Sequence, residues 1–195
     1  MGRNKNLQTH QNLLEAGVAA FLQNGYHGTG LKEVLDSVDV PKGSFYAYFE
    51  SKEEFAEAAI DFYTDCFLQE MSDITAAHSS PLLGLRAFFA KLVADFERRE
   101  YRGGCLIANL AGELEGSTVC HNALKRGYQR WLEQMAALFR KGQELGEFRA
   151  DVPPGELANL LMDSWEGAVL RMKVEHSTSP LNRCLSSLLE GYCRG

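Results

Sequence analysis

The stretch Pro41–Phe55, PKGSFYAYFESKEEF, concentrates side chains that can contact a nucleic acid. Four aromatic rings, at positions 45, 46, 48 and 49, follow the dipeptide Lys42-Gly43. Phenol hydroxyls and lysine ammonium groups donate to phosphate, and glycine lets a backbone approach a ligand closely. A core segment has no use for this mixture. The pattern favours a surface that contacts DNA through its polar groups and packs inward through Phe45 and Phe49.

A second reactive group is the thiol of Cys105, which directly follows Gly103-Gly104 at the start of a predicted helix. Unpaired N–H groups at a helix N-terminus stabilise a thiolate, and three arginines lie upstream at positions 98, 99 and 102. Both conditions favour a nucleophilic thiol that reacts with electrophiles or oxidants. A small buried side chain is an equally open interpretation of this cysteine from the residues alone.

Other chemistry finds little support in the residue pattern. The five cysteines are odd in number and form no C-x-x-C, and the five histidines have no spacing typical of metal ligands. No phosphate-binding loop, dinucleotide-binding glycine pattern or G-x-S-x-G is present. The sequence therefore predicts no metal, no cofactor and no enzymatic activity. A helical thiol enzyme that uses Cys105 remains the alternative from a different class.

We expect helices to position these groups, because apolar residues recur with a period of 3.6 along the chain and no alternating strand pattern occurs. We predict an all-α fold of about nine helices. Thr29 is the expected N-cap of the second helix, and Ser51–Glu54 is expected to form a capping box that opens the fourth. The fourth helix is apolar on two faces, one of them ending at Cys66. Asn24-Gly25 is expected to end the first helix. Three later helices carry predicted apolar stripes, which comprise Leu85, Phe88, Phe89, Leu92 and Phe96 in the fifth, Leu157, Leu161, Trp165, Ala168 and Met172 in the eighth, and Leu181, Leu185, Leu188 and Tyr192 in the ninth.

Charge and composition bound the class of protein. Hydrophobic residues make up 45% and charged residues 24% of the 195 residues, which is typical of a globular protein with a core. The net charge is −6, but residues 1–52 are neutral overall, so only a locally basic face is compatible with DNA binding. No apolar run is long enough for a membrane span, and the polar N-terminus is not a secretory signal. We therefore expect a cytoplasmic protein without membrane contact.

The first three helices have the spacing of a helix-turn-helix unit, in which the second short helix, Lys42–Tyr48, enters the DNA major groove. We predict a DNA-binding domain over residues 1–52 and a ligand-sensing and dimerisation domain over residues 53–195. A plain three-helix bundle with a solvated edge of lysine and tyrosine side chains is the alternative interpretation of the same spacing.

This segment resembles the N-terminal signature of the TetR family of transcriptional repressors. The matching residues are Gly25-Tyr26, Thr29, Val34, Val40–Tyr46, Tyr48-Phe49 and Ser51–Glu53. The resemblance implies a homodimer joined by its last two helices, a pseudo-palindromic double-stranded DNA operator, and a ligand cavity in each subunit. It also implies DNA contacts by Thr29, Lys42, Gly43, Ser44, Tyr46, Tyr48 and Lys52. Two departures, at Ala47 and at Gly30-Leu31, affect the expected base preference.

A second resemblance concerns the signal that the protein receives. The segments Arg102–Leu110 and Trp165–Lys173 are similar to the branch of that family which contains the N-ethylmaleimide-responsive and acrylate-responsive repressors. In that branch, the cysteine at the Cys105 position responds to electrophiles or oxidants. We hypothesise that Lys173 holds the Cys105 thiolate or traps its sulfenic acid as an S–N bond; a surface lysine is the alternative. The remaining candidate ligand residues are Asn109, Trp165, Trp131, Tyr63 and Phe67.

These observations predict a homodimeric repressor that a small electrophile or oxidant acting at Cys105, or a ligand bound beside it, releases from its operator. A variant of this interpretation keeps the DNA binding, makes Cys105 inert and assigns release to a non-covalent apolar inducer.

Overall fold

The computed structural model describes residues 2–194, with side chains from residue 6 onward. Within that range it contains nine α-helices, the last of which continues as a π-helix, so the predicted all-α fold is confirmed. The helices are α1 (Gly2–Gly28), α2 (Leu31–Ser37), α3 (Lys42–Phe45), α4 (Lys52–Ala76), α5 (Pro81–Arg98), α6 (Leu106–Ala111), α7 (Thr118–Glu144), α8 (Pro154–Glu175), α9 (Ser179–Cys184) and the π-helix η1 (Leu185–Tyr192).

The chain packs into two compact units. Unit 1 contains the residues up to Asp65 together with Cys105–Tyr128, and unit 2 contains Cys66–Gly104 together with the residues from Gln129 onward. The long helices α4 and α7 each contribute their first part to unit 1 and the rest to unit 2. The predicted division between residues 52 and 53 concerns function and stays a prediction. Packing alone draws α6 and the start of α7 into the same unit as α1, α2 and α3.

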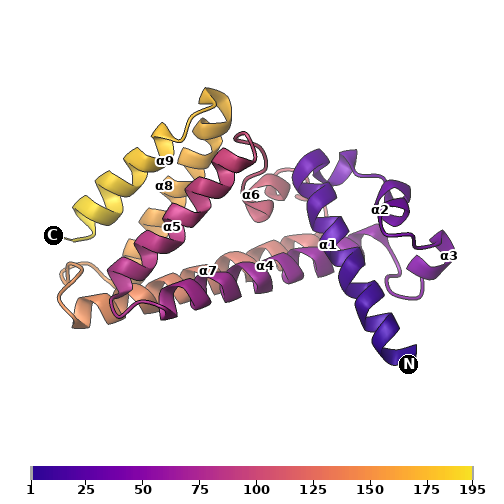
Figure 1. Cartoon of the computed structure of the whole chain (residues 1–195), viewed down its shortest axis with the longest axis horizontal. Coiled ribbons are helices and arrows are strands. Elements are labelled where there is room, and N and C mark those ends of the chain that lie inside the picture. Colours follow the sequence, from indigo (N-terminus) through magenta and orange to yellow (C-terminus); the bar gives the residue numbers. More distant parts are fainter. Residues whose placement is uncertain (1, 195) are drawn as a thin grey trace. The chain divides into compact units, whose positions relative to one another are not determined.

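Unit 1 is built around α1, with α2 and α3 on one side and α6 beside its C-terminal part (Figure 1). The core shared by these helices consists of fully or almost fully buried side chains. Full burial of one such side chain contributes about 1.5–3 kcal/mol relative to exposure. The largest members are Leu13, Phe21, Phe45, Phe55, Ile60, Leu106 and Leu110.

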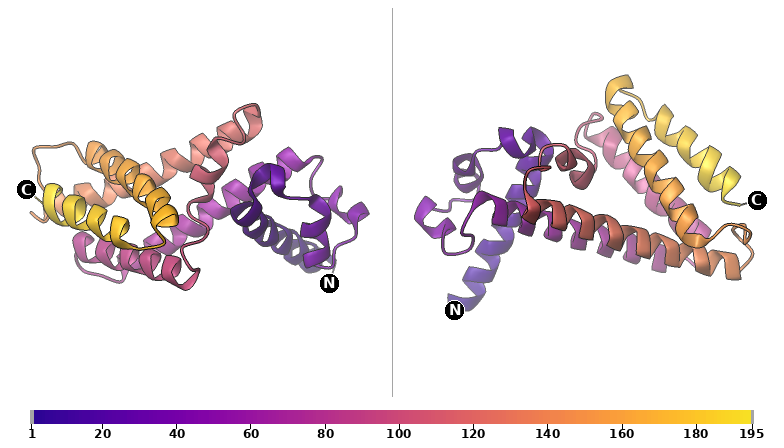
Figure 2. Two further views of the ribbon diagram at one scale, coloured as in Figure 1. Left: turned by 90° about the horizontal axis from the view of Figure 1, so that it is seen from above. Right: turned by 180° about the vertical axis from the view of Figure 1, so that it is seen from behind.

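Unit 2 is a bundle of α5, α8, α9 and η1 with the second halves of α4 and α7. Figures 1 and 2 show α9 and η1 running beside α8, which agrees with the close backbone approach of α8 to α9. The stripe predicted for α8 is buried throughout, from Leu157 to Met172. The stripe predicted for α5 supplies the fully buried Leu85 and Phe88. The period of 3.6 therefore identified the core faces of these two helices correctly.

The first helix is broken where the sequence predicts its end. Gly25 has φ 72° and ψ 179°, a conformation that side chains with a Cβ rarely adopt, and one further turn follows it. The expected N-cap of α2 is wrong, because Gly30 occupies that position and no side chain caps the helix. Thr29 is instead buried, and its hydroxyl donates to the Gly25 carbonyl oxygen at 2.6 Å. The break in α1 makes the Gly25 carbonyl available as an acceptor, and the Thr29 hydroxyl bonds to it and does not cap α2.

The turn between α2 and α3 passes through Asp39, which has a φ of 53°. The N–H of Val40 donates back to the Leu35 carbonyl at 3.0 Å and closes the turn. Helix α3 begins at Lys42 as predicted, but it ends at Phe45 and not at Tyr48. The chain tightens there because the Tyr48 N–H bonds to the Phe45 carbonyl, three residues back, at 2.9 Å.

Helix α4 opens with part of the predicted capping box. The Ser51 hydroxyl oxygen accepts a hydrogen bond from the Glu54 N–H at 3.0 Å, as expected. The Glu54 carboxylate accepts from the N–H of Glu50, however, and not from that of Ser51. Farther along the helix, Cys66 is exposed, so its assignment to an apolar face was wrong. The buried face changes where α4 passes from the core of unit 1 into unit 2.

The C-terminal stripe differs from the prediction by one residue. The structure buries Leu181, Leu189 and Cys193, whereas Tyr192 is 43% exposed. The Cys193 N–H donates to the carbonyl of Leu188, five residues earlier, at 2.8 Å. A π-helical turn holds more residues than an α-helical turn. Buried side chains here therefore recur every four residues, and the three-residue step that the α-helical pattern placed between Leu185 and Leu188 does not occur.

No helix among residues 2–194 is long and apolar enough to cross a membrane.

Candidate functional site

Four of the predicted DNA-contacting residues lie together on the exposed side of α3. We call Lys42, Gly43, Ser44 and Tyr46 the α3 surface; all four are exposed, and the Tyr46 ring is 56% exposed. Phe45, between them, is 1% exposed and packs edge-on against the Tyr46 ring at 5.4 Å. The predicted division of this segment into an inward and an outward side is therefore confirmed. The outward side presents an ammonium, two hydroxyls and the backbone of a helix start.

Gly43 has no structural reason to be glycine. A Cβ atom built on it meets nothing within 4 Å, and its φ is not positive. Glycine within a helix costs about 0.8–1 kcal/mol relative to alanine, so unit 1 gains nothing from it. Close approach of a binding partner's backbone is the remaining physical reason for a missing side chain at an exposed helix start.

The other three predicted DNA contacts point elsewhere. Thr29 is buried and hydrogen-bonded to Gly25. Tyr48 is half-buried, and its hydroxyl donates to Asn6 of α1 at 3.4 Å. The Lys52 ammonium donates to the Tyr26 carbonyl at 2.6 Å and lies 4.3 Å from the centre of the Tyr26 ring. DNA contacts by these three residues stay predictions, and a contact by Thr29 would have to use its backbone.

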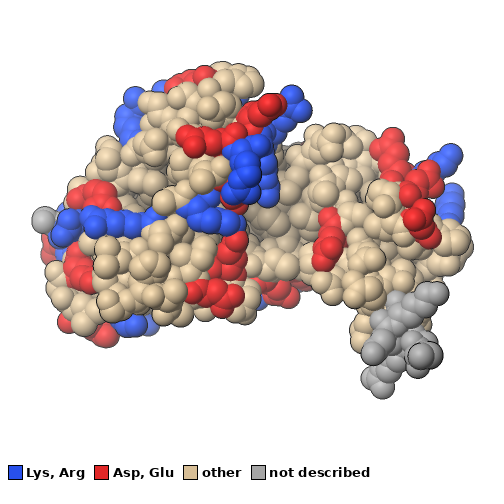
Figure 3. Space-filling view, in the orientation of Figure 1, with Lys and Arg blue, Asp and Glu red and all other residues tan. Residues whose placement is uncertain are grey.

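The charge around α2 and α3 is mixed. Figure 3 shows acidic and basic side chains together over the end of unit 1 where these helices lie. Lys32 and Lys42 are exposed there, and so are Glu33, Asp36 and Asp39. A surface of this kind attracts DNA weakly over long distances, so short-range hydrogen bonds from the α3 surface have to supply much of the affinity.

A second cluster joins the loop after α6 to the end of α1, and we call it the Gly25 clamp. Glu113, in the loop between α6 and α7, accepts a hydrogen bond from the His27 N–H at 2.9 Å through its carboxylate. The Glu113 carbonyl accepts a second bond from Nε2–H of the same histidine at 3.1 Å. The carboxylate also lies against Gly25, where an added Cβ would stand 2.2 Å from Oε1. Glycine at position 25 thus serves both the positive φ and this approach.

Lys52 extends the Gly25 clamp to the first turn of α4. Its ammonium binds the carbonyl of Tyr26, which lies between the two residues that Glu113 contacts. Partial burial lowers the pKa of Lys52 from its ordinary value, while the negative charge of Glu113 opposes that shift. One acidic side chain therefore contacts the end of α1 directly and acts electrostatically on the start of α4, all within unit 1.

Cys105 is the N-cap residue of α6 and is half-buried. Its carbonyl accepts the N–H of Asn109 at 3.0 Å, so these two predicted sensing residues are one helical turn apart. Burial raises the pKa of the Cys184 thiol and that of the Cys193 thiol, each to about 11. Burial also raises the pKa of the fully buried Cys120. A raised pKa makes these three thiols poor nucleophiles at neutral pH. Cys105 is partly exposed, as is Cys184, whereas Cys120 and Cys193 are buried.

Two of the three arginines upstream of Cys105 have acidic partners in unit 2. Arg98 forms an ion pair with Asp95 at 2.5 Å, and Arg102 lies 3.9 Å from Glu100. Part of the positive charge that the sequence places before Cys105 is therefore balanced locally.

The predicted ligand residues divide between the two units. Tyr63, Cys105 and Asn109 belong to unit 1, whereas Phe67, Trp131, Trp165 and Lys173 belong to unit 2. Lys173 is half-buried near the end of α8, and its pairing with Cys105 stays a prediction. In unit 2 the rings of Phe67, Phe88, Phe89, Trp131 and Trp165 form a continuous series, with neighbouring centroids 4.7–6.4 Å apart. We call these five residues the aromatic cluster.

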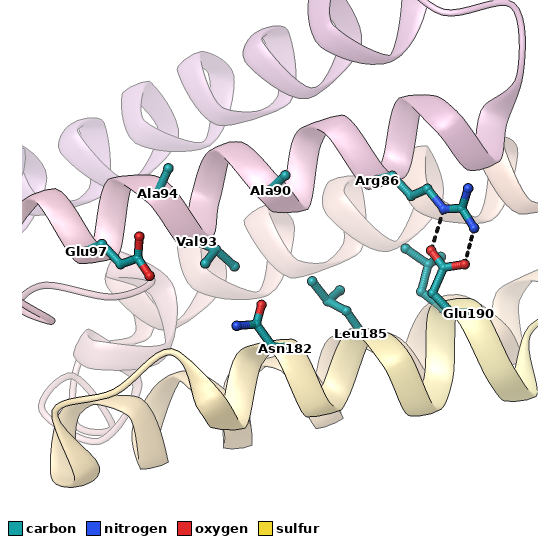
Figure 4. Close-up of a pocket in the computed structure, with 9 residues that line it drawn as sticks. Arg86, Ala90, Val93, Ala94, Glu97, Asn182, Leu185 and Glu190 are labelled. Atoms are coloured by element: carbon teal, nitrogen blue, oxygen red, sulfur yellow. Dashed lines mark hydrogen bonds and ion pairs between the residues drawn. The ribbon is translucent and has the colours of Figure 1, made fainter.

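A separate groove of about 270 Å³ lies between α5 and the helical segment formed by α9 and η1. Figure 4 shows Arg86 and Glu190 joined by two hydrogen bonds at one end of it, with Ala90, Val93 and Leu185 along its length. The groove contains none of the predicted ligand residues. Its charged side chains are engaged with each other or, in the case of Glu97, with the Thr178 hydroxyl at 3.1 Å.

Glu113 and Phe89 complete these clusters, and the sequence did not single them out. Glu113 lies 86 positions from His27, in a segment without a motif, so no sequence signal connects the two. Phe89 stands in a predicted apolar stripe, where one more aromatic residue carries no signal of its own. No group of three or more His, Cys, Asp or Glu side chains in the described part of the chain is arranged to hold a metal ion.

Comparison with known proteins gives the class to which this fold and these surfaces belong. Residues 13–59 match the model of bacterial regulatory proteins of the tetR family. Residues 81–188 match the model of the tetracyclin repressor-like C-terminal domain. The chain belongs to the TetR family of bacterial transcriptional regulators, and the predicted family membership is confirmed.

Individual relatives extend over almost the whole chain. The HTH-type transcriptional repressor DhaR of Mycobacterium sp. (strain GP1) is 36% identical over 92% of this chain and 90% of its own. The transcriptional regulator AcuR of Cereibacter sphaeroides is 37% identical over 89% of this chain and 80% of its own. The crystal structure of the reduced form of Escherichia coli NemR is 27% identical, with a TM-score of 0.88, and covers 95% of this chain and 97% of that one.

Proposed function

We propose that this protein is a homodimeric repressor that binds a pseudo-palindromic DNA operator and leaves it when a small electrophile or oxidant reacts at Cys105. The DNA-binding part rests chiefly on the α3 surface, where Lys42, Ser44 and Tyr46 are exposed around a glycine that the fold does not require. A recognition helix of each subunit would enter adjacent major grooves, with half-sites about 34–36 Å apart. Repression, and not activation, is favoured by the similarity to the repressor DhaR.

The homodimer is supported by an apolar face of α8 that lies at the surface. Leu160, Leu170 and Val174 are 39%, 65% and 77% exposed, and their spacing places them on one side of the helix together with Gly167 and the exposed Asp163. Exposed apolar stripes on a helix mark interaction surfaces, and a second copy of α8 would bury this one.

The proposed signal is a reaction of the Cys105 thiolate with a small electrophile such as an α,β-unsaturated carbonyl compound. The sulfur forms a bond to the β-carbon, the π electrons of the alkene move toward the carbonyl to give an enolate, and the α-carbon then takes a proton from water. Support comes from the position of Cys105 at the start of α6, from its partial exposure, and from the relative NemR, whose structure is that of a reduced form.

The Gly25 clamp offers a route by which such a reaction would reach the DNA-binding helices. Cys105 begins α6, and Glu113 follows its end, eight residues farther along the chain. A shift of this short helix would pull the Glu113 carboxylate away from Gly25 and His27 and leave Lys52 without its acidic neighbour. The ends of α1 and α4 that carry the helix-turn-helix unit would then move. A coupling of about 1–3 kcal/mol weakens binding roughly 5- to 150-fold.

A non-covalent apolar inducer is the second candidate signal, and the aromatic cluster of unit 2 favours it. The cluster provides four buried rings and the half-buried ring of Phe67 without charged groups, which is a typical lining for a small-molecule site. The alternative of a thiol enzyme loses support, because the matching families and the relatives named above are transcriptional regulators.

The decisive experiment measures operator affinity at fixed salt for the reduced protein, with and without one equivalent of a thiol electrophile. The DNA is the upstream region of the protein's own gene, supplemented by a selection from random sequences. We expect the wild type to weaken at least fivefold and Cys105→Ser to remain unchanged. Cys66→Ser, which removes an exposed cysteine, is the matched control and should respond like the wild type.

The outcomes separate the candidates. Weakening of both the wild type and Cys105→Ser would contradict sensing at this thiol, and absence of any selected DNA would contradict the α3 surface. The Lys173 hypothesis is tested by the rate at which the electrophile alkylates Cys105. An unchanged rate in Lys173→Ala would contradict it.

A further inference from the structure

The indole nitrogen of Trp131 stands out among the buried polar atoms of the described residues. Trp131 lies on α7 and is 5% exposed, and its Nε1 is buried without a hydrogen-bond partner. Buried tryptophan N–H groups usually find an acceptor, because leaving one unpaired costs more than a hydrogen bond contributes. Such exceptions in native proteins generally have a reason in strain, bound water or ligand binding.

The surroundings of this N–H group within unit 2 are apolar. The Phe67 ring lies 6.4 Å from the Trp131 ring and packs in turn against the fully buried Phe88. Met135, one turn along α7, is also fully buried. Gln134, one turn along α7, directs its amide to the Leu68 carbonyl at 3.0 Å, so it is already engaged.

The other tryptophan provides an internal comparison. Trp165 is 4% exposed and packs on Phe89 at 4.7 Å between ring centres, in the same aromatic cluster. Its nitrogen is not among the buried atoms that lack a partner. Among the tryptophans, the buried and unpaired donor is thus found at Trp131 alone of the two positions that the structure describes.

We propose that Nε1–H of Trp131 is the hydrogen-bond donor of a ligand site in the aromatic cluster, and that the ligand is a small neutral molecule with a carbonyl oxygen. An indole only donates, so it selects an acceptor. The five members of the cluster carry no charge, and a carboxylate buried among them would have no countercharge. The inference rests on the proposed function, in that it names the chemical class of the non-covalent inducer given there as the second candidate signal.

The test compares two probes of the same shape, cyclohexanone and methylenecyclohexane, in which the carbonyl oxygen is replaced by a CH₂ group. The reduced full-length protein is labelled with ¹⁵N-tryptophan, and its two indole signals are assigned with Trp131→Phe and Trp165→Phe. We expect the ketone to move the Trp131 indole proton downfield. We also expect Trp131→Phe to bind the ketone about three- to tenfold more weakly than the wild type, with the affinity for the alkene unchanged within twofold.

Trp165→Phe is the matched control and should keep the wild-type ratio of ketone to alkene affinity. An equal loss for both probes in Trp131→Phe would assign only packing to this ring and overturn the proposal. The same holds if acetone, butanone and cyclohexanone all fail to move the Trp131 signal up to their solubility. A water contact of the indole proton that persists at saturating ketone would also overturn it.

Failure of this inference is distinguishable from failure of the proposed function, because operator affinity is measured on the same samples. Operator binding together with an unchanged ratio of ketone to alkene affinity in Trp131→Phe would remove the carbonyl site and leave the repressor. The expected ratio change without any DNA binding would leave the carbonyl site and remove the repressor.

Discussion

At the scale of single residues, two glycines of unit 1 are required for different reasons. Gly25 is fixed by the fold, because it combines a φ of 72° with the contact to Glu113. A Cβ on Gly43 would meet no other part of the protein, so close approach of a binding partner is the remaining reason for the missing side chain. Substituting each glycine therefore separates a requirement of the fold from a requirement of binding.

Gly43→Ala should change stability and DNA affinity in opposite directions. Alanine raises the free energy of unfolding by about 0.5–1 kcal/mol, because it is the better helix former and meets no neighbour. The added methyl group obstructs the DNA backbone, and operator affinity falls at least tenfold. Urea unfolding and a DNA titration at fixed salt measure the two effects. Gly155→Ala, in a comparably open position of α8, should leave DNA affinity unchanged.

Gly25→Ala should destabilise unit 1 without any partner present. The positive φ alone costs about 1–3 kcal/mol for a residue with a Cβ, and the methyl group would press on the Glu113 carboxylate. Thermal unfolding of the single variant and of Gly25→Ala with Glu113→Ala separates the two contributions. A double variant as stable as Glu113→Ala alone would contradict the backbone argument.

At the scale of elements, the Arg86–Glu190 pair connects α5 to η1 beside the groove in Figure 4. The hydrogen bond from Arg86 lowers the pKa of the Glu190 carboxyl below its ordinary value, partial burial opposes the shift, and the charge of Arg86 adds to it. A carboxyl whose pKa is lowered by folding stabilises the folded state above its unfolded-state pKa, and this stabilisation is lost as the pH falls through the folded-state pKa.

Glu190→Gln should therefore cost a few tenths to about 1 kcal/mol of unfolding free energy at pH 7. The difference from the wild type should remain constant down to about pH 5 and shrink below the ordinary glutamate pKa of 4.5. Urea unfolding at pH 7, 5 and 3.5 gives the comparison. Glu115→Gln, at an exposed glutamate in the loop before α7, is the control for general acid effects. A difference that grows on acidification would contradict the assignment.

The helices also show how far the sequence alone determines such a structure. Apolar periodicity located α5 and α8, the turn before Lys42 located the start of α3, and the capping-box motif identified the Ser51 hydroxyl. Each of these features depends on residues within a few positions. The π-helical register, the burial of Thr29 and the Gly25 clamp depend on contacts between distant segments. Trp131 was a candidate ligand residue from its type, but only packing reveals that its N–H lacks a partner.

At the scale of the whole molecule, the proposed function depends on two subunits holding two α3 surfaces at a fixed distance. An isolated subunit would contact one half-site and lose most of the operator affinity, because the second contact no longer benefits from the first. The exposed apolar residues of α8 support a dimer that forms through this helix.

Leu170→Glu should convert the dimer into monomers and weaken operator binding by a factor of 100 or more. Two copies of a charge would face each other in an apolar contact, and the cost of burying them exceeds the contribution of the leucine pair. Sedimentation velocity and a DNA titration measure the two effects together. Leu145→Glu, at an exposed leucine after α7, should alter neither. A Leu170→Glu dimer of wild-type affinity would place the contact elsewhere.

The wide turn of η1 also has an evolutionary consequence. A π-helix arises when one residue is added to an α-helix, and the rest of the segment absorbs it without unfolding. Relatives without this residue should align with a one-residue gap between Leu185 and Tyr192. Their buried residue should then lie three positions after the equivalent of Leu185, whereas Leu189 of this chain lies four positions after it. Which branches of the family carry the gap would date the insertion relative to their divergence.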